Sequence, residues 1–393
     1  MAGLSSYRNY VGVAKVTTDG LVANSGGIAA LATSVTVTVL DGTPLATMSV
    51  TFLDGPNTET VALSAYSAGV ATIAATTYAH PQGCYMLFQP TASLGPTNYM
   101  PVRTFKVPDK YDQLYDLSHQ GSLVAEMGVV QGIRASEWDI EGDVFGDTFG
   151  FILGGLYGSS DFTSGSPNTW AFGVNNQSNG QPVKYAYYVY DGVNMRIVVG
   201  RITSVTMKFD PKALISYTAK LLARASGVVA TTTPSYALTV LPSWRAVATF
   251  ASNYIRTPLS AEFTLARSEA ENIPTLNGTQ DPYDTFVGAL KSSGKISIVK
   301  EDDSWLSNYL AGTIYTFSLA FLQGTGATQI GLTMQFTKAN SDTDEPILQG
   351  KSYNTEDISF TGVANTTDAT TSGGGESTSK VILKNAVATG SYT

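Results

Sequence analysis

Ser136-Glu137-Trp138-Asp139-Ile140 is a segment in which polar and apolar side chains alternate, and it recurs as Ala261-Glu262-Phe263-Thr264-Leu265. Strict alternation of this kind predicts a half-buried β-strand. Three further segments follow each copy in the same order. After the first copy they are 147–149, 205–209 and 215–218, and after the second they are 284–286, 332–336 and 358–361. Four matches in one order predict a duplicated β-rich domain whose loops differ in length.

The composition narrows the fold class and the kinds of partner. The chain has 393 residues, of which 43% are hydrophobic and only 14% charged, with 38 Gly and 21 Tyr. This is typical of a mainly β protein of two or three domains with many turns and little helix. The net charge of -8 argues against a surface that binds nucleic-acid phosphates, because such surfaces need clustered Lys and Arg.

The termini and the cysteine content exclude further classes. Residues 1–10 lack a basic segment followed by an apolar one, and no stretch approaches the ~20 apolar residues of a membrane span, so we expect neither secretion by that route nor membrane insertion. Cys84 is the sole cysteine, which excludes an intrachain disulfide and any multi-cysteine metal site.

The N-terminal part has the pattern of a small β-sandwich. Residues 1–30 are predicted to form an arm or an edge strand. From Ser34 apolar and polar residues alternate up to a turn at residues 41–44, and further short strand-like runs follow at 48–53, 61–65, 69–75 and 84–89. Residues 31–107 resemble the immunoglobulin-like modules of bacteria and phages, and Val107-Pro108-Asp109-Lys110 is predicted to be the linker after them.

Each copy of the duplicated unit is predicted to carry one helix on its sheet. In the first domain, residues 108–232, Asp147 is the expected N-cap and Gly158 the expected end. In the second domain, residues 233–370, Asp281 is the expected cap and Gly294 the end. Residues 371–393 are predicted to be a flexible tail in which 380–384 could add as a strand to a neighbour.

The search for catalytic or metal-binding residues gives none. His80 and His119 have no metal or triad spacing and are interpreted as surface or hydrogen-bonded histidines. Cys84 lies in an alternating apolar strand and is expected to be a buried, inert thiol. We therefore predict no enzyme activity, cofactor or metal.

One charged pattern remains to be explained. Glu137, Asp139, Glu141 and Asp143 alternate with Trp138 and Ile140, so one side of this strand is acidic. It could be a solvated sheet face, a calcium site completed by loops, or the wall of a water-filled channel that repels phosphate. A second acidic run, residues 301–303, is predicted to be a loop.

The tandem domains resemble the major tail tube proteins of long-tailed, siphovirus-type bacteriophages. The resemblance covers residues 108–370 and is carried by residues 259–267, by Asn277-Gly278-Thr279-Gln280-Asp281-Pro282-Tyr283, and by the strand and turn at 358–368. It implies that each fold adds a sheet to an inner barrel, that rings stack, and that DNA slides through an acidic lumen. Two folds per chain imply trimeric rings with pseudo-sixfold symmetry in preference to hexamers, with the immunoglobulin-like module outside.

The resemblance also implies the protein's place and partners. It indicates a structural virion protein, assembled in the host cytoplasm, that contacts copies of itself and the tail terminator and tail tip proteins. The tape measure protein and double-stranded DNA would pass through its lumen without specific binding. Independently, a sheet with a helix on one face and water on the other should close into a barrel with its neighbours, because open edges invite aggregation.

Two other classes of protein compete with this interpretation. One is a cell-surface or fibre-like binding protein built from β-sandwiches. The other is a β-rich glycosidase, which needs paired carboxylates across a cleft. The duplication argues against the glycosidase, because Thr264 and Ala266 replace Asp139 and Glu141 in the second copy.

Overall fold

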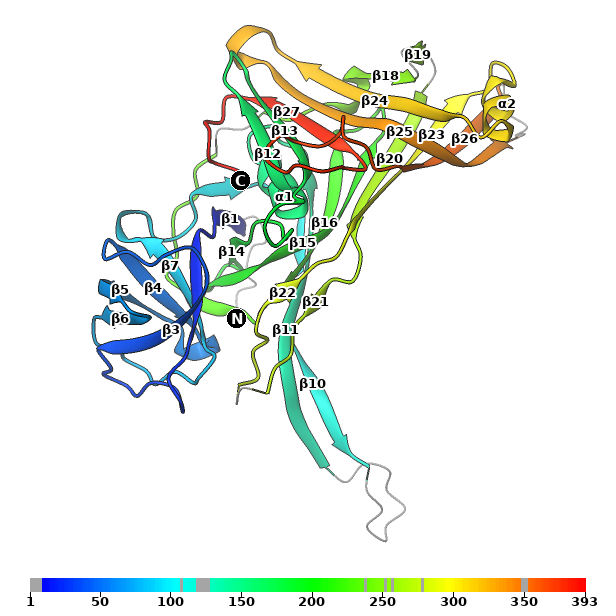
Figure 1. Cartoon of the computed structure of the whole chain (residues 1–393). Coiled ribbons are helices and arrows are strands. Elements are labelled where there is room, and N and C mark those ends of the chain that lie inside the picture. The colour runs from blue at the N-terminus through cyan, green and yellow to red at the C-terminus, as the bar shows by residue number, and fades with distance from the viewer. Residues whose placement is uncertain are drawn as a thin grey trace.

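The computed structural model describes residues 9–106, 109–117, 128–236, 239–250, 253–255, 258–276, 279–347 and 353–393. The fold is mainly β, as the composition predicted, and the described residues include two α-helices. Figure 1 shows a small N-terminal barrel beside a larger β body, from which one long hairpin projects.

The N-terminal barrel is closed and has its own core. Its strands are, in order around the barrel, β2 (Thr18–Val22), β3 (Ser34–Asp41), β6 (Val70–Ile73), β5 (Glu59–Ser67), β4 (Met48–Leu53) and β7 (Tyr85–Pro90). Val35, Val50 and Phe52 are fully buried inside it. The strand β2 belongs to this barrel, although the sequence placed it in an N-terminal arm. The preceding strand β1 (Tyr10–Lys15) pairs with β8 (Asn98–Met100) and β14 (Tyr185–Tyr190) in the body, so it is not an arm either.

The body contains two four-stranded antiparallel units of the same strand order. The first is β10 (Asp109–Asp116), β11 (Gly128–Asp143), β16 (Ser216–Ala223) and β15 (Met195–Phe209). The second is β20 (Pro258–Arg267), β23 (Leu290–Val299), β26 (Thr355–Gly362) and β25 (Ile330–Ile347). A helix follows the second strand of each order, α1 (Phe149–Tyr157) after β11 and α2 (Ser304–Leu310) after β23.

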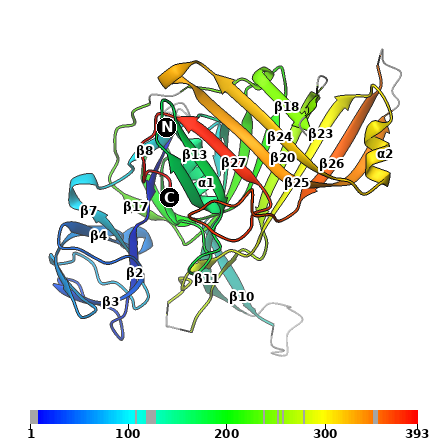
Figure 2. The same ribbon diagram turned by 45° about the horizontal axis from the view of Figure 1, so that its top comes forward.

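Pairing between β15 and β20 joins the two units into one sheet, in which β9 (Thr104–Lys106) lies beside β11 next to β10. A second layer covers the apolar face of this sheet (Figure 2). It includes α1 and the strands β12 (Gly158–Thr163), β13 (Asn168–Val174), β14, β24 (Ile314–Gln323) and β27 (Lys380–Asn385). The short strands are β17 (Gly227–Val229), β18 (Ala246–Phe250), β19 (Asn253–Ile255), β21 (Glu271–Asn272) and β22 (Thr285–Phe286).

The helix α1 forms where the sequence predicted it, but its cap differs. It ends at Gly158, whose φ of 85° favours glycine. The N-cap residue is Thr148, and no side chain caps the helix, so the assignment of Asp147 as the cap is wrong. A turn explains the shift, because the N–H groups of Thr148 and Phe149 both donate to the carbonyl oxygen of Phe145.

The helix predicted after Asp281 does not form. Residues 285–286 are β22 and residues 290–299 are β23, so the helical stripe at 283–290 was misleading. From Leu290 onward buried and more exposed residues alternate, which is the pattern of a strand. At Gly294 an added Cβ would collide with the rings of Phe263 and Phe360, which pack over the bare backbone. The helix of the second unit is α2, after the 301–303 loop, so the counterpart of β11 is β23 and not the 261–265 segment in β20.

The C-terminal segment is packed against the body, and the prediction of a flexible tail is wrong. Asp161 accepts hydrogen bonds from the N–H groups of Thr371 (2.6 Å) and Ser372 (2.9 Å). The strand β27 pairs with β13 and β25 of its own chain, and the Tyr392 side chain is fully buried. The segment has the composition of a linker because many of its residues are small and polar. In the folded protein the hydrogen bonds of these residues hold the segment against the body.

Candidate functional site

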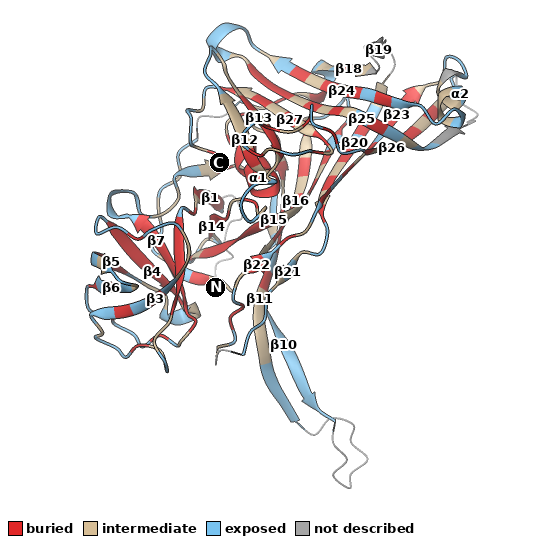
Figure 3. Ribbon diagram, viewed as in Figure 1, coloured by how far each residue is buried: buried red, intermediate tan, exposed pale blue. Residues whose placement is uncertain are grey.

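The uncovered face of the sheet is the candidate site, and the acidic strand lies on it. In β11 Trp138 and Ile140 are fully buried, and the alternating residues Glu137, Asp139, Glu141 and Asp143 lie on the opposite face. Figure 3 shows the alternation of buried and less buried positions along the strands. The strand and its alternation are as predicted.

The surroundings of these carboxylates are not wholly acidic. Lys110 Nζ lies 2.7 Å from Glu137 Oε2, and Arg103 lies 2.5 Å from an oxygen of Asp143. Lys106 of β9 and Lys220 of β16 stand opposite Asp139 on its two sides. Neighbouring strands therefore neutralise much of the strand's negative charge.

The second unit carries the opposite charge at the equivalent strand. On the same face of the sheet β23 presents Lys291 and Lys295, and Lys295 Nζ lies 2.8 Å from Asp357 Oδ2 on β26. An ion pair of 3.4 Å between Lys208 and Glu262 crosses the junction of the two units. The face is thus a pattern of alternating charges across both units.

Small hydroxyl side chains fill the space between the charges. Thr206 and Thr264 share a hydrogen bond of 3.2 Å across the junction between β15 and β20. Other members of this set are Ser204, Ser216, Thr218, Ser293, Ser297, Ser359 and Thr361. Two shallow depressions of about 320 Å³ and 210 Å³ lie over Glu262 and Lys295. The face is polar, and its charges are largely engaged with one another.

Two edges of this sheet are open among the described strands. On one side, β9 and β10 have β11 as their registered partner and nothing beyond it. On the other side, residues 341–347 of β25 pair with β26 alone, because β24 and β27 end beside the first half of β25. Strand edges of this kind can pair with another chain, although α2 contacts β25.

The β10–β11 hairpin extends away from the body, and its outer part is exposed (Figures 1 and 3). Leu114 is 58% exposed and Val130 is 68% exposed, and Tyr115 and Val129 are also more than half exposed. Apolar side chains concentrated on a projecting element indicate a contact with another protein surface.

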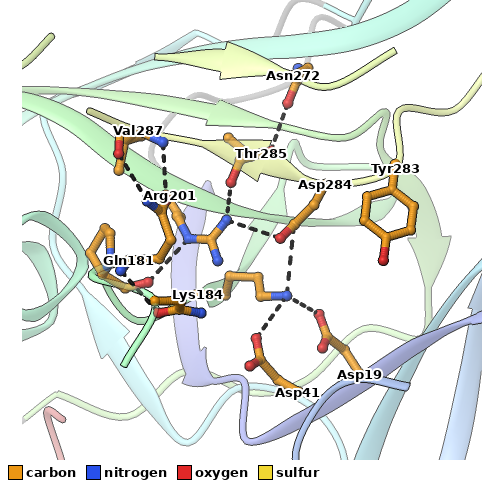
Figure 4. A network of polar contacts seen from close by, with 12 residues as sticks. Asp19, Asp41, Gln181, Lys184, Arg201, Asn272, Tyr283, Asp284, Thr285 and Val287 are labelled. Atoms are coloured by element: carbon orange, nitrogen blue, oxygen red, sulfur yellow. Dashed lines mark hydrogen bonds and ion pairs between the residues drawn. The ribbon is translucent and has the colours of Figure 1, made fainter. Parts of the chain in front are cut away.

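A buried charge network joins the barrel to both units (Figure 4). Lys184 Nζ lies 2.6 Å from Asp19 Oδ2 and 3.0 Å from Asp41 Oδ2 of the barrel, and 3.7 Å from Asp284 Oδ1. Burial alone would raise the pKa of Asp284, but the charges of Arg201 and Lys184 lower it below the usual aspartate value. Sequence reasoning missed this network, because its members are far apart in the chain and share no motif.

The residues considered for chemistry have structural roles. His80 is buried between Asp54 (3.3 Å) and Glu59 (2.8 Å) and stacks on the Phe52 ring, as expected for a hydrogen-bonded histidine. His119 lies outside the described residues. Cys84 is buried, which raises the pKa of its thiol. Asp281 forms an ion pair with Arg134 of β11, which also lies 3.6 Å from Asp54 of the barrel.

Two features are absent from the described part of the chain. It holds no group of three or more His, Cys, Asp or Glu side chains placed to bind a metal ion. Neither of its helices is long and apolar enough to cross a membrane.

Comparison with known families gave one match. A family model described as "Phage tail tube protein" matches residues 127–375. The matched range runs from the start of β11 to beyond β26, so it covers both units of the sheet except β10 and leaves out the barrel. A comparison with curated proteins gave no match.

Proposed function

Because the chain belongs to the phage tail tube protein family, whose members are structural components of the virion tail and not enzymes, we propose that its sheet lines the channel of that tube. Family membership implies self-assembly into a tube and association with other tail components. The proposal is that chains close into rings, that rings stack, and that double-stranded DNA passes from capsid to host along the polar face. The tape measure protein would occupy the same channel before DNA, and terminator and tip proteins would bind the tube's ends.

The observation that carries this proposal is the asymmetry of the sheet. One face is covered by a second layer, the other carries charged and hydroxyl side chains in both units, and neither lateral edge pairs with a further strand among the described residues. Lateral pairing with further copies would give the backbone groups at these edges hydrogen-bond partners. It would also produce a closed wall with water inside.

The identical strand order of the two units supports a duplicated tube fold. If each unit occupies one sixth of a ring, three chains complete it with pseudo-sixfold symmetry. The barrel would then lie on the outside, because Ala186 and Tyr188 of β14 pack against it while Tyr185 and Tyr187 face the core below. It would decorate a tail of the long, siphovirus type that assembles in the host cytoplasm.

The charges on the polar face favour transit over binding. DNA carries one charge per ~1.7 Å of axis, and proteins bind it by offering free Lys and Arg that displace its counterions. Lys110, Lys208 and Lys295 are instead paired with carboxylates on the same face. The role proposed for the acidic strand is therefore to pair with nearby Lys and Arg side chains, so that these do not bind phosphate. The residues concerned are Glu137, Asp139, Glu141 and Asp143. The channel wall would then carry both positive and negative charges and would not be uniformly acidic.

The position of the polar face can be tested by thiol labelling. Thr218→Cys places a thiol on the polar face and Ser64→Cys places one on the exposed barrel surface, while the native Cys84 is buried and should not react. Negative-stain imaging should first show rings or tubes. A maleimide on a polymer wider than the channel should then label Ser64→Cys in tubes and in dissociated chains, but Thr218→Cys only after dissociation. Equal labelling of both variants in intact tubes would place the polar face outside.

A further inference from the structure

We propose that a pocket between three loops of the body binds an organic carboxylate, a carboxyl group with an apolar substituent, through the guanidinium of Arg267. The pocket has a volume of about 520 Å³. The loops that line it are residues 174–181 at the end of β13, residues 286–290 between β22 and β23, and residues 376–378 before β27. The inference concerns a second site of the protein and does not depend on how chains assemble.

Arg267 is a cation on the side of β20 where the strand is otherwise apolar. Phe263 and Leu265 are fully buried on the covered face of the sheet, and the alternation of the strand places Arg267, its last residue, on the same side. Arg267 is only 8% exposed. A buried charge is unfavourable unless it is paired and hydrogen-bonded, so its presence here requires an explanation.

Hydrogen bonds to backbone carbonyl oxygens fix the position of the guanidinium. Its Nε donates to Leu156 (2.9 Å) and its Nη2 to Tyr157 (3.0 Å), both in the last turn of α1. Its Nη1 donates to Gly288 (3.0 Å) at the pocket. A guanidinium has five N–H groups, so the described partners leave one N–H on Nη1 and one on Nη2. A carboxylate can accept two parallel hydrogen bonds from such a pair.

The charge of Arg267 has no carboxylate partner among the described residues. Burial lowers the pKa of its guanidinium to about 10, so it is charged at neutral pH. Arg134 is also largely buried, but its hydrogen bonds to Asp281 raise its pKa above the usual arginine value. A bound carboxylate would give Arg267 the kind of partner that Asp281 gives to Arg134.

Hydrogen bonds between the loops hold the walls of the pocket together. The Gln181 side chain donates to the carbonyl oxygen of Val287 and accepts from its N–H, both at 3.0 Å (Figure 4). Asn176 donates to the carbonyl oxygens of Gly374 (2.8 Å) and Glu376 (2.9 Å). Walls that are already ordered lower the entropic cost of binding a ligand.

The other residues at the pocket favour one class of anion. Phe286 is 43% exposed and lines the pocket beside Val287, Ala289 and Leu290, so an apolar substituent has surface to cover. The exposed Glu376 also lines the pocket, and its charge opposes anions that carry more than one negative charge. The site therefore fits a singly charged carboxylate with an aliphatic or aromatic group better than it fits phosphate.

Calorimetric titration of the full chain with three probes tests the proposal. Benzoate represents a free organic acid, N-acetylphenylalanine represents the C-terminal residue of a protein, and N-acetylphenylalaninamide is its neutral control. We expect saturable binding of at least one acid and binding of the amide that is weaker by about tenfold or more. Tighter binding of benzoate would identify a free acid as the ligand, and tighter binding of N-acetylphenylalanine a protein C-terminus. If neither acid binds, or the amide binds as well as the acid, the proposal is overturned.

Substitutions then test which residues bind the better acid. Arg267→Lys keeps the charge but cannot offer two parallel N–H groups, so the affinity should fall about tenfold. Glu376→Gln removes a like charge from the pocket and should raise the affinity. Arg134→Lys changes a buried arginine that already has a carboxylate partner, and it is the matched control whose affinity should equal that of the parent.

A further substitution guards against damage to α1, whose last turn Arg267 contacts. Phe286→Ala changes a partly exposed side chain and leaves Arg267 in place. It should weaken the binding of benzoate several-fold more than that of acetate, which has no ring to cover. Urea unfolding of each variant shows that it is folded. Unchanged affinity for the better acid in both Arg267→Lys and Phe286→Ala would exclude this pocket as the site.

Discussion

Lys184 is the residue on which contacts between the barrel and both units of the sheet converge. Its side chain is 4% exposed and lies within 3.7 Å of carboxylates from the barrel and from the second unit. A buried charge of this kind adds little over a well-packed apolar residue, but removing it leaves its partners uncompensated. The Asp19 carboxylate is buried, and one of its oxygens lacks a hydrogen-bond partner. The other oxygen also accepts a hydrogen bond from the Tyr85 hydroxyl, which is neutral and cannot replace the charge of Lys184.

We expect Lys184→Met to lower the free energy of unfolding by about 3 kcal/mol, because Asp19 would remain as a buried, unpaired charge. Lys208→Met removes an exposed lysine from an ion pair and should cost less than about 1 kcal/mol. Urea unfolding of both variants measures the difference. Equal losses would mean that the buried network does not hold the barrel in place.

The lowered pKa of Asp284 predicts a dependence of stability on pH. Its carboxylate is held in the charged form, so the stabilisation is complete above the pKa of an unfolded aspartate, about 3.9. It is lost as the pH falls from there through the lower pKa of the folded protein, because unfolding then takes up a proton. Asp284→Asn should be less stable than the parent at pH 6, and the difference should shrink towards pH 3. Urea midpoints across this range test the sign.

At the scale of elements, α1 and β11 were predictable and α2 and β23 were not. The α1 segment has an apolar stripe and Gly158 to end it, and β11 has strict alternation. Residues 283–290 also have the apolar spacing of a helix. However, the rings of Phe263 and Phe360 pack directly over the backbone of Gly294, and this packing favours a strand at that position. These are contacts between distant parts of the chain, which override a local pattern. The open edges were likewise invisible, since they depend on where β24 and β27 end.

The β10–β11 hairpin is the element whose exposed surface most requires a partner, and we expect it to contact the next ring. Val130→Asp should therefore leave ring formation intact while preventing stacking, because the change buries a charge only at that contact. Val70→Asp, at an exposed position of the barrel, is the control and should give normal tubes. Imaging separates single rings from tubes, and normal tubes from the Val130 variant would exclude the hairpin from stacking.

At the scale of the whole molecule, each layer has a different task. In the proposed tube the polar face would be the innermost layer. The shared core and β14 lie on the other side of the sheet, and the barrel packs over β14 and β15 through contacts among Tyr85, Leu87 and Ile197. The barrel is therefore packed against the body of the chain and is not attached only at its linker. Removing it would expose apolar residues of β14 and β15 to water, so we expect a truncated chain to lose stability before it loses any assembly contact.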